Sequence, residues 1–263
     1  TQSIWGWHSF TDTANYKFEE TLKDYDQSGR KVSYAVQIKQ PIRKLNAGNW
    51  FRQNPHRLQL GNLGFVILKK NGTEATIKDI QNIQQSLNLY TGEIISKFTV
   101  ENIPVEVHTL CHQSKDAIGV QVFSPLLQLG KLKISLRFPF PTDAFKDVAT
   151  NYSNANKHQS DYNQSSTKTA IFHHILDNTI YYSSVNAVSN ISIAKKQPHE
   201  YWITPTNIAD NSFSFTCQFT NSTKTIVYSS FQQVKNSSLN SWQQFWNSGA
   251  AIDFAGSTDS RAN

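Results

Sequence analysis

Residues 132–138 read LKISLRF, and every second side chain in this stretch is apolar. The apolar positions are Leu132, Ile134, Leu136 and Phe138. This alternation predicts a β-strand with one buried and one solvated face, because successive side chains of a strand point to opposite sides. Such strands are typical of antiparallel sheets that pack in layers.

The same period of two recurs along most of the chain. Further predicted strands lie around Val32–Ile38, Leu63–Ile67, Val105–Val107, Ile118–Val122, Ile180–Tyr182 and Phe213–Phe219. Asn71-Gly72 predicts a tight turn after the second of these. Few of the links could hold a crossover helix, so most strand pairs are expected to be antiparallel. The sequence therefore predicts an all-β fold, and a large β-sandwich rather than an α/β enzyme.

Three segments depart from this pattern. Residues 141–169 are polar and without periodicity, which predicts a long loop or flap. Ile80, Ile83 and Leu87 have the spacing of a short helix. Near the C-terminus, a helix is predicted from a cap at Ser237-Ser238 to an end at Gly249. Its apolar positions are Leu239, Trp242, Phe245 and Trp246. Two tryptophans on one helix face need a partner to cover them.

Composition excludes several classes of function. The formal charge of +6 comes from only 17% charged residues, and Lys and Arg are scattered along the 263 residues. Nucleic-acid binding is not expected, because it needs positive charge concentrated on one surface. No apolar run approaches the roughly 20 residues of a membrane helix. The chain contains no methionine and is rich in Asn, Gln, Ser and Thr. We therefore expect an exported protein, periplasmic or extracellular, whose signal peptide has been removed.

Cysteine and histidine positions give no metal site. Cys111 and Cys217 are the two cysteines; the sequence leaves their pairing open, and two isolated buried thiols are favoured. His173 and His174 are adjacent in a predicted strand and would point to opposite faces. His108, Cys111 and His112 lack further residues that would complete a tetrad. Nucleophile-elbow, phosphate-loop and dinucleotide motifs are absent too, so no cofactor is expected.

The acidic residues show no catalytic pair in their local sequence, and spacing does not decide the point, since two such acids need only meet in space. Most of the 19 lie in turn contexts such as Asp24-Tyr25-Asp26, or alone at strand ends such as Asp116. A glycosidase acid needs a setting that raises its pKa. None of these carboxylates has such a setting in the sequence, so no catalytic residue is assigned.

Aromatic and polar residues give a better lead. Trp5 and Trp7 flank Gly6, and His8 and Phe10 follow. A second cluster, Asn54, His56 and Arg57, surrounds Pro55 at the predicted entrance to a strand. Pro55 restricts the residue before it to extended geometry, and the shift of apolar parity downstream predicts a bulge near Gly61-Asn62. Aromatic rings beside amides and guanidinium groups are typical of small-molecule sites. The alternative is a core or inter-domain seam.

Several stretches, taken in order, resemble the N-terminal region of bacterial six-hairpin glycosidases, related to glycoside hydrolase family 65 and the acid-trehalase and maltose-phosphorylase group. They are WGWHSF at 5–10, NPHRL at 54–58, LGNLG at 60–64, LNLYTG at 87–92 and SWQQFWNSGAAIDF at 241–254. The stretch at 241–254 resembles a linker to a catalytic domain. Two positions depart from that pattern: Ala250 stands where a glycine would be expected, and Ser260, after the stretch, stands where a proline would be expected.

The resemblance implies a galactose-mutarotase-like β-supersandwich over residues 1–235. Residues 236–263 would then form a linker helix and the start of an (α/α)6 barrel that holds the catalytic acid and is absent from this chain. Two groups of residues are implied to be functional. Trp5, Trp7, His8, Asn54, His56 and Arg57 would bind substrate or line a domain interface, and Trp242, Phe245 and Trp246 would face the barrel.

The function expected from this resemblance is that of a non-catalytic domain. It would pack on the barrel of a glycoside hydrolase and help to shape its sugar site, and the parent enzyme would hydrolyse O-glycosidic bonds of an oligosaccharide or glycoside. The two alternatives are a free-standing, lectin-like carbohydrate-binding protein and a purely structural interaction module. A homodimer is also compatible with the sequence.

Overall fold

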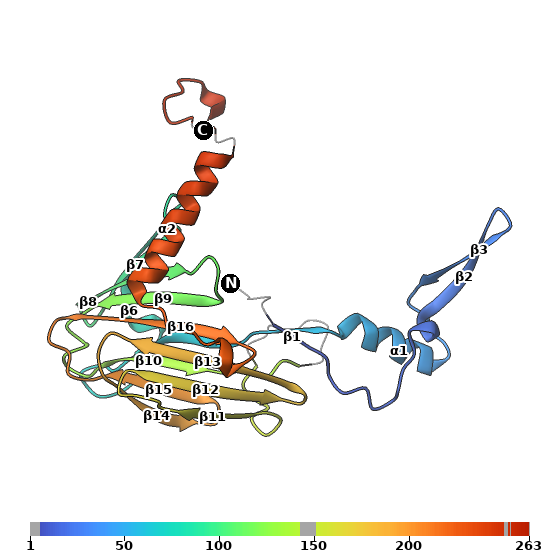
Figure 1. Ribbon diagram of the computed structural model, residues 1–263, viewed down its shortest axis with the longest axis horizontal. Coiled ribbons are helices and arrows are strands. Elements are labelled where there is room, and N and C mark those ends of the chain that lie inside the picture. The colour runs from blue at the N-terminus through green and yellow to red at the C-terminus, as the bar shows by residue number, and fades with distance from the viewer. Residues whose placement is uncertain (1–5, 143–150, 250–251, 253, 263) are drawn as a thin grey trace.

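The computed structural model describes residues 6–142, 151–249, 252 and 254–262. Two antiparallel sheets form the body of the molecule (Figure 1). The larger sheet has the order β11-β12-β13-β16-β9-β8-β7-β6. Its strands are Gln159–Asn163, Thr169–Leu176, Thr179–Ala187, Ser212–Thr220, Ala117–Phe123, Ile103–Cys111, Glu93–Val100 and Ile80–Asn88, in that order. The smaller sheet has the order β14-β15-β10-β5, with strands Ile191–Gln197, Glu200–Pro205, Leu132–Arg137 and Asn62–Ile67.

The core lies between the two sheets and is built from the alternating positions that the sequence predicts. In β10, Leu132, Ile134 and Leu136 are each no more than 1% exposed. They belong to one apolar cluster with residues of β12, β13 and β16. All strand pairs among the described residues are antiparallel. The prediction of an all-β sandwich is therefore confirmed.

A cluster of buried histidines lies in this core. Nδ1 of His158 is 2.7 Å from Nε2 of His174, and the rings of His158 and His199 stack with centroids 3.6 Å apart. Ser160 Oγ lies 2.8 Å from His199 Nδ1 and from the hydroxyl of Tyr201. Burial lowers the pKa of His158 to about 4 and that of His174 to about 2, and neighbouring histidines add to both shifts. These rings therefore pack as neutral groups.

Two element predictions are wrong. Residues 80–88 form strand β6 at the edge of the larger sheet instead of a helix, because pairing with β7 outweighs the helical spacing of three apolar residues. The register shifts between Gln81 and Gln84, where Asn82 has a left-handed φ of 53° and Ile83 is 67% exposed. Within 141–169, residues 143–150 lie outside the described part, and Gln159–Asn163 is strand β11 rather than loop.

Residues 11–53 leave the sandwich and form a projecting arm (Figure 1). The arm contains η1 (Phe18–Thr21), the hairpin β2–β3 (Leu22–Gln27 and Arg30–Ala35) and helix α1 (Ile42–Gln53). Its parts pack on one another: the rings of Phe18 and Phe51 are 5.7 Å apart, and Arg43 makes a two-point ion pair with Glu20. The apolar residues of α1 show no clear helical stripe, so this helix was not predicted.

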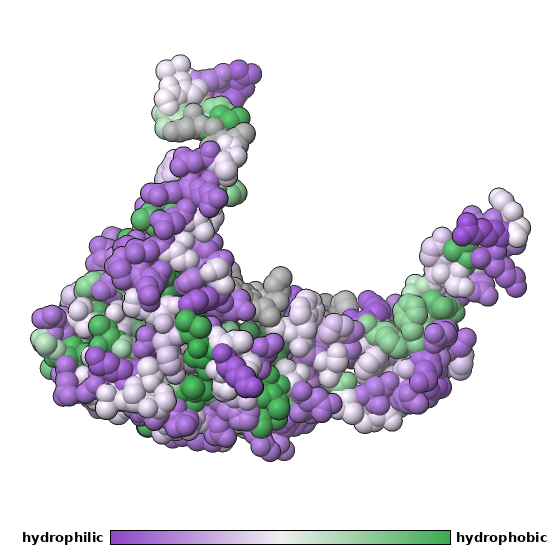
Figure 2. Space-filling view, in the orientation of Figure 1, coloured by the Kyte–Doolittle hydropathy of each residue, from purple (hydrophilic) through white to green (hydrophobic). Residues whose placement is uncertain are grey.

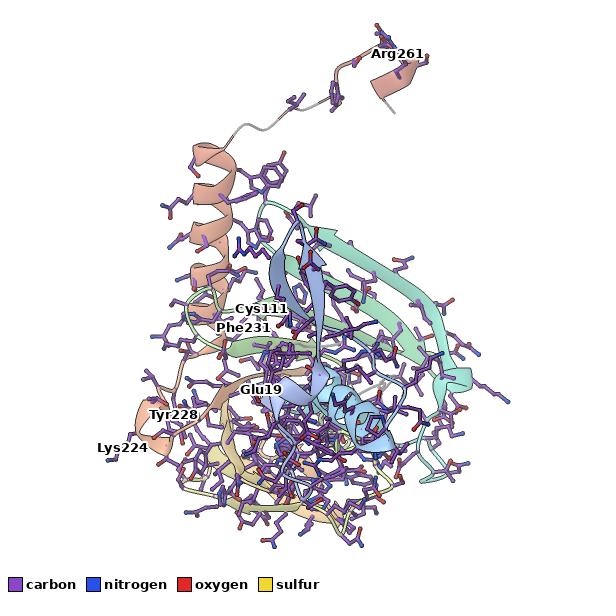
Figure 3. All side chains as sticks on the ribbon, turned by 90° about the vertical axis from the view of Figure 1, so that its right-hand side faces the viewer. Glu19, Cys111, Lys224, Tyr228, Phe231 and Arg261 are labelled. Carbon is purple, nitrogen blue, oxygen red and sulfur yellow. The ribbon has the colours of Figure 1, made fainter. Side chains whose placement is uncertain are left out.

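Helix α2 (Phe231–Ser248) begins on the larger sheet and extends beyond it (Figure 1). It ends at Gly249, as predicted, but begins well before the predicted cap at Ser237-Ser238. Ser230 caps it by accepting a hydrogen bond from Gln233 N, and Gln233 Oε1 accepts one from Ser230 N. Phe231 and Val234 pack with Leu110 of β8. Figure 3 labels Phe231 and Cys111, the last residue of that strand. The helix therefore crosses the predicted domain boundary at 236.

Candidate binding surfaces

The first surface is built on a short strand pair, β1 (Gly6–His8) and β4 (His56–Leu58). In this pair Trp7 lies opposite Arg57, and His8 lies opposite His56. Residues directly opposite in an antiparallel pair project from the same face. One face therefore carries the exposed Trp7 and Arg57, whereas His8 and His56 are buried, at 1% and 8% exposure.

His8 joins the strand pair to the larger sheet. Its Nδ1 lies 2.8 Å from Thr179 Oγ1, and its Nε2 lies 3.1 Å from Asp177 Oδ2. Burial lowers the pKa of His8, although the nearby Asp177 carboxylate opposes the shift. Both ring nitrogens are engaged within the fold, so His8 positions the backbone of Trp7.

Asn54 joins the two ends of the arm. Its Oδ1 accepts a hydrogen bond from Phe10 N at 2.9 Å, and its Nδ2 donates to Trp50 O at 3.0 Å. Its backbone is extended and β4 begins two residues later, so the predicted strand entrance is confirmed. The bulge predicted near Gly61-Asn62 is wrong: the chain passes there from the β1–β4 pair to β5 of the smaller sheet.

Six residues were singled out around this strand pair, and their positions differ. Trp5 lies outside the described residues. His8, Asn54 and His56 have their side chains inside or partly inside the fold. Trp7, 55% exposed, and Arg57 remain accessible to a ligand or partner.

An open cleft of about 590 Å³ lies beside Trp7. Four chain segments line it: the β1–β4 region, the loop at 114–116, the start of β13, and the end of β16 with η3 (Thr223–Thr225). Figure 3 labels Lys224 in η3 at the edge of the molecule. Of the residues that line this cleft, only Trp7 was singled out from the sequence, because the other lining segments are far apart in the chain.

The second surface is the C-terminal end of α2. Trp242 and Trp246 stack with ring centroids 6.4 Å apart, and Phe245 meets Trp246 edge-on at 5.2 Å. The tip of the β6–β7 hairpin supports them: the Tyr90 ring is 5.7 Å from that of Trp246, and Trp246 Nε1 donates to Leu89 O at 2.8 Å. Phe245 is nevertheless 58% exposed. The three residues singled out in this helix thus form one aromatic cluster.

Gly92 allows the hairpin tip to approach α2. Its φ is +68°, and a Cβ there would lie 2.2 Å from Trp242 Nε1 and 2.9 Å from Ser238 Oγ. The latter hydroxyl donates to Thr91 O at 2.7 Å. A side chain at this position would therefore push the helix away from the hairpin.

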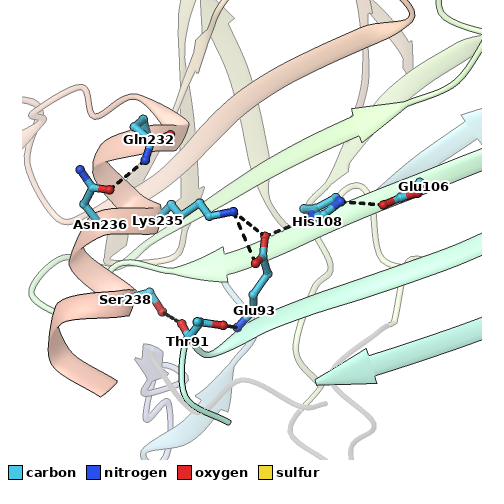
Figure 4. Close-up of polar contacts among 8 residues, drawn as sticks. All are labelled: Thr91, Glu93, Glu106, His108, Gln232, Lys235, Asn236 and Ser238. Atoms are coloured by element: carbon cyan, nitrogen blue, oxygen red, sulfur yellow. Dashed lines mark hydrogen bonds and ion pairs between the residues drawn. The ribbon is translucent and has the colours of Figure 1, made fainter. Parts of the chain in front are cut away.

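A charged network fixes the same helix to the sheet (Figure 4). Lys235 Nζ lies 3.2 Å from Glu93 Oε1, and His108 Nδ1 lies 2.9 Å from the same oxygen. His108 Nε2 contacts Glu106 Oε1 at 2.9 Å. Burial opposes ionisation of Glu93, but the hydrogen bonds from His108 and Lys235 outweigh it and lower its pKa. The pKa of Glu106 is lowered by hydrogen bonds from His108 and Lys97.

The pKa values of Glu93 and Glu106 are lowered, whereas a general acid needs a raised pKa. Within the described ranges, no group of His, Cys, Asp and Glu side chains could hold a metal ion. Cys111 and Cys217 do not pair; Cys217 is buried, whereas Cys111 is exposed. The network links α2 to the larger sheet.

Comparison with known proteins gives similarity in structure only. No family model and no curated protein sequence matches the chain. A solved structure of a bacterial glucoamylase complexed with acarbose matches with a TM-score of 0.48 at 9% identity, covering 75% of this chain. A putative kojibiose phosphorylase from the human microbiome matches with a TM-score of 0.43 at 9% identity, covering 76%. The chain spans 33% and 27% of those two chains.

Proposed function

We propose that this chain is a non-catalytic β-sandwich domain of a glycoside hydrolase. In this proposal it packs on a catalytic domain of the same polypeptide and helps to shape that domain's sugar-binding site. The observation that carries the proposal is the aromatic end of α2, which stands beyond the sandwich. The kind of enzyme is proposed from the sequence resemblance to six-hairpin glycosidases.

The aromatic end of α2 continues into an exposed apolar hairpin tip. Leu87, Leu89 and Tyr90 are 54%, 53% and 64% exposed, beside Phe245 at 58%. Each buried aromatic side chain removes roughly 150–250 Å² from water, so leaving such a group exposed is costly. Contiguous apolar surface of this kind is typical of a protein–protein contact.

The arm and α2 both extend beyond the sandwich and leave a concave outline between them (Figures 1 and 2). We propose that the catalytic domain occupies this concavity, with the aromatic cluster of α2 against its first helices and Arg57 near its rim. Reaction chemistry would then reside in the catalytic domain. The parent reaction would be hydrolysis of an O-glycosidic bond in an oligosaccharide or glycoside, without a cofactor.

The gene provides the first test. Reading past the codon for Asn263 should reveal a helix-rich continuation of several hundred residues. A stop codon directly after it, or a continuation of another class, would overturn the proposal. In parallel, the 263-residue chain should show no turnover of glycosides; measurable turnover would place the catalytic residues within it.

The interface provides the second test. In the continuous protein, a Phe245→Ala/Trp246→Ala variant should lose the contact between the two domains, seen as separate thermal transitions in calorimetry. A Leu129→Ala/Val188→Ala variant is the control, because it removes two apolar side chains, each 60% exposed, from loops of the sandwich. Unchanged single-transition unfolding of the α2 variant would count against docking through this helix.

We also propose that the protein is exported. None of the described helices is long and apolar enough to cross a membrane. The surface rich in short polar residues supports export, and cell fractionation tests it. Recovery of the protein only from the cytoplasm would contradict this proposal.

A further inference from the structure

The edge strands of the two sheets, β11 and β14, lie on the same side of the sandwich (Figure 1). Side chains join this edge: the Tyr162 hydroxyl donates to Ile193 O at 3.2 Å, and Gln164 Nε2 donates to Ile191 O at 2.9 Å. Strand β11 has only five residues and pairs on one side with β12. Contacts between the sheets therefore contribute much of the free energy that holds β11 in place.

The buried histidine cluster (His158, His174 and His199) also lies at this edge and joins the two sheets. His174 belongs to β12, and His199 lies in the turn between β14 and β15. His158, which precedes β11, contacts both rings, His174 at 2.7 Å between nitrogens and His199 at 3.6 Å between ring centroids. From this position we infer that the cluster is an acid-operated latch, which releases residues 151–163 from the smaller sheet while the rest of the sandwich stays folded.

Hydrogen bonds fix His199 in its neutral form. Its Nε2 lies 2.8 Å from Ala155 O, a carbonyl that only accepts, so Nε2 carries the proton. Its Nδ1 then accepts from the Ser160 hydroxyl at 2.8 Å, and Ser160 Oγ accepts from the Tyr201 hydroxyl, also at 2.8 Å. A second ring proton, on Nδ1, would point at the Ser160 hydrogen. It would reverse this chain of donors, which links β11 to β15.

The contact between His158 and His174 has room for one proton between the two nitrogens. At 2.7 Å, one nitrogen donates and the other accepts. If both nitrogens carried protons, two N–H groups would face each other. The other nitrogen of His174, Nδ1, is buried without a hydrogen-bond partner among the described residues. A protonated His174 would therefore bury an unpaired N–H as well as a charge.

Within the described ranges, no ion pair joins a carboxylate to any of the three rings. The ion pairs of histidines involve other residues, namely His8, His108 and His173. Asp161 of β11 lies 3.7 Å from His173, on the opposite face of the sheet. Lys195 of β14 contacts Ser160 O at 3.5 Å. Burial lowers the pKa of His199, and the charge of Lys195 adds to this effect, although the hydrogen bond with Ala155 O opposes it.

The other groups around the cluster offer no negative charge either. Burial raises the pKa values of Tyr181 on β13 and Tyr201 on β15, so both tyrosines stay neutral in acid. Phe140 lies 5.6 Å from the His158 ring, and Lys157 Nζ lies 5.8 Å from the Phe140 ring. Protonated rings in this setting have positive or apolar neighbours. They are stabilised once the cluster opens to water.

Release of residues 151–163 is a small movement that opens the cluster. This segment carries Ala155, His158 and Ser160, whereas β12 and the β14–β15 pair can keep their ladders with β13 and β10. The inference is independent of the proposed function, because α2 packs on β8 and β9 at another part of the larger sheet. Failure of the latch and failure of domain docking are therefore separate results.

Hydrogen exchange followed by mass spectrometry tests the latch in the 263-residue chain. Exchange is measured at pH 7.5, 6 and 5, and each rate is compared with that of an unstructured chain at the same pH. We expect the protection of residues 151–163 to fall tenfold or more between pH 7.5 and 5, since each proton taken up below pH 6.5 contributes about a factor of ten per pH unit. At every pH these residues should exchange faster than β8 and β9.

A variant identifies the group responsible. In His158→Gln the amide can still hydrogen-bond to His174 but takes up no proton, so the fall in protection of residues 151–163 should be smaller. His112→Gln, directly after β8, is the control and should leave the fall unchanged.

Three results would overturn the inference. The first is protection of residues 151–163 that does not depend on pH. The second is exchange of residues 151–163 at the same rate as β8 and β9, which would show that acid acts only through unfolding of the whole chain. The third is a fall as steep in a folded His158→Gln chain as in the parent. The first two are measured on the parent chain, so they decide the matter even if the variant does not fold.

Discussion

At the scale of single residues, glycine is required at position 92 both by the backbone conformation and by the closeness of Trp242. Gly92→Ala would place a methyl group against Trp242 and in a left-handed backbone conformation. We expect it to destabilise the fold by about 2–4 kcal/mol, combining backbone strain with overpacking. Urea denaturation measures the loss.

Gly72→Ala is the matched control for this prediction. Gly72 also has a positive φ, of +81°, but a Cβ there meets nothing within 4 Å. It should cost only the backbone part, about 1–2 kcal/mol. Equal losses in the two variants would show that the contact with Trp242 contributes nothing.

The buried histidines predict acid sensitivity. His158 and His174 have folded-state pKa values of about 4 and about 2, below the ordinary value of 6.5. Between those values and 6.5 the unfolded chain binds protons that the folded chain does not. Stability should therefore be complete above pH 6.5 and fall as the pH falls, by up to about 1.4 kcal/mol per pH unit for each histidine.

Urea denaturation at pH 7.5, 6 and 5 checks this dependence. His174→Gln removes one titrating group, so the free energy of unfolding should depend less steeply on pH. His173→Gln serves as the control, because this neighbour lies on the opposite face of β12. A parent chain equally stable at all three pH values would contradict the prediction.

At the scale of elements, α2 is attached to the larger sheet near its start and middle, and to the tip of the β6–β7 hairpin near its end. Glu93→Gln removes the charge that both Lys235 and His108 contact. We expect a loss of about 1–3 kcal/mol and faster amide hydrogen exchange in the helix. Glu106→Gln is the control, since Glu106 pairs with His108 and Lys97 but not with α2. Unchanged exchange in Glu93→Gln would show that apolar packing alone holds the helix.

The strands were predictable from the sequence where one face is buried. In β10 and in the first part of β16, alternation and burial coincide, so pattern alone identified them. Strand β6 was not predictable in this way, because it lies at the sheet edge and its side chains are mostly exposed. Helix α1 was missed because it packs within the arm and has only Ala47 and Gly48 fully buried.

At the scale of the whole molecule, the arm of residues 11–53 is an insertion that is structurally separate from the sandwich. Phe10 and Asn54, at its two ends, are joined by a hydrogen bond of 2.9 Å. Replacing residues 11–53 by a short Gly-Ser linker should leave the sandwich folded, with its melting temperature changed by only about 2–4 °C. Differential scanning calorimetry measures this. Collapse of the fold would show that the arm supports the sandwich directly.

The candidate sites were predictable only in part, for a reason that also belongs to this scale. Trp7 and Arg57 are far apart in the chain but lie opposite each other in a strand pair. Both were singled out from local clusters of aromatic and polar residues and from the family resemblance. The cleft beside Trp7 depends on Asp116 and Asn221, which tertiary folding alone brings near it. The local sequence pattern gives no information about which distant segments lie together in the fold.

The irregular edge strand β6 affects how the protein associates with itself at high concentration. A regular edge would offer a continuous row of backbone donors and acceptors to another chain. In β6 the left-handed Asn82 and the register shift beside it interrupt that row. The interruption therefore disfavours edge-to-edge pairing of the larger sheet through β6.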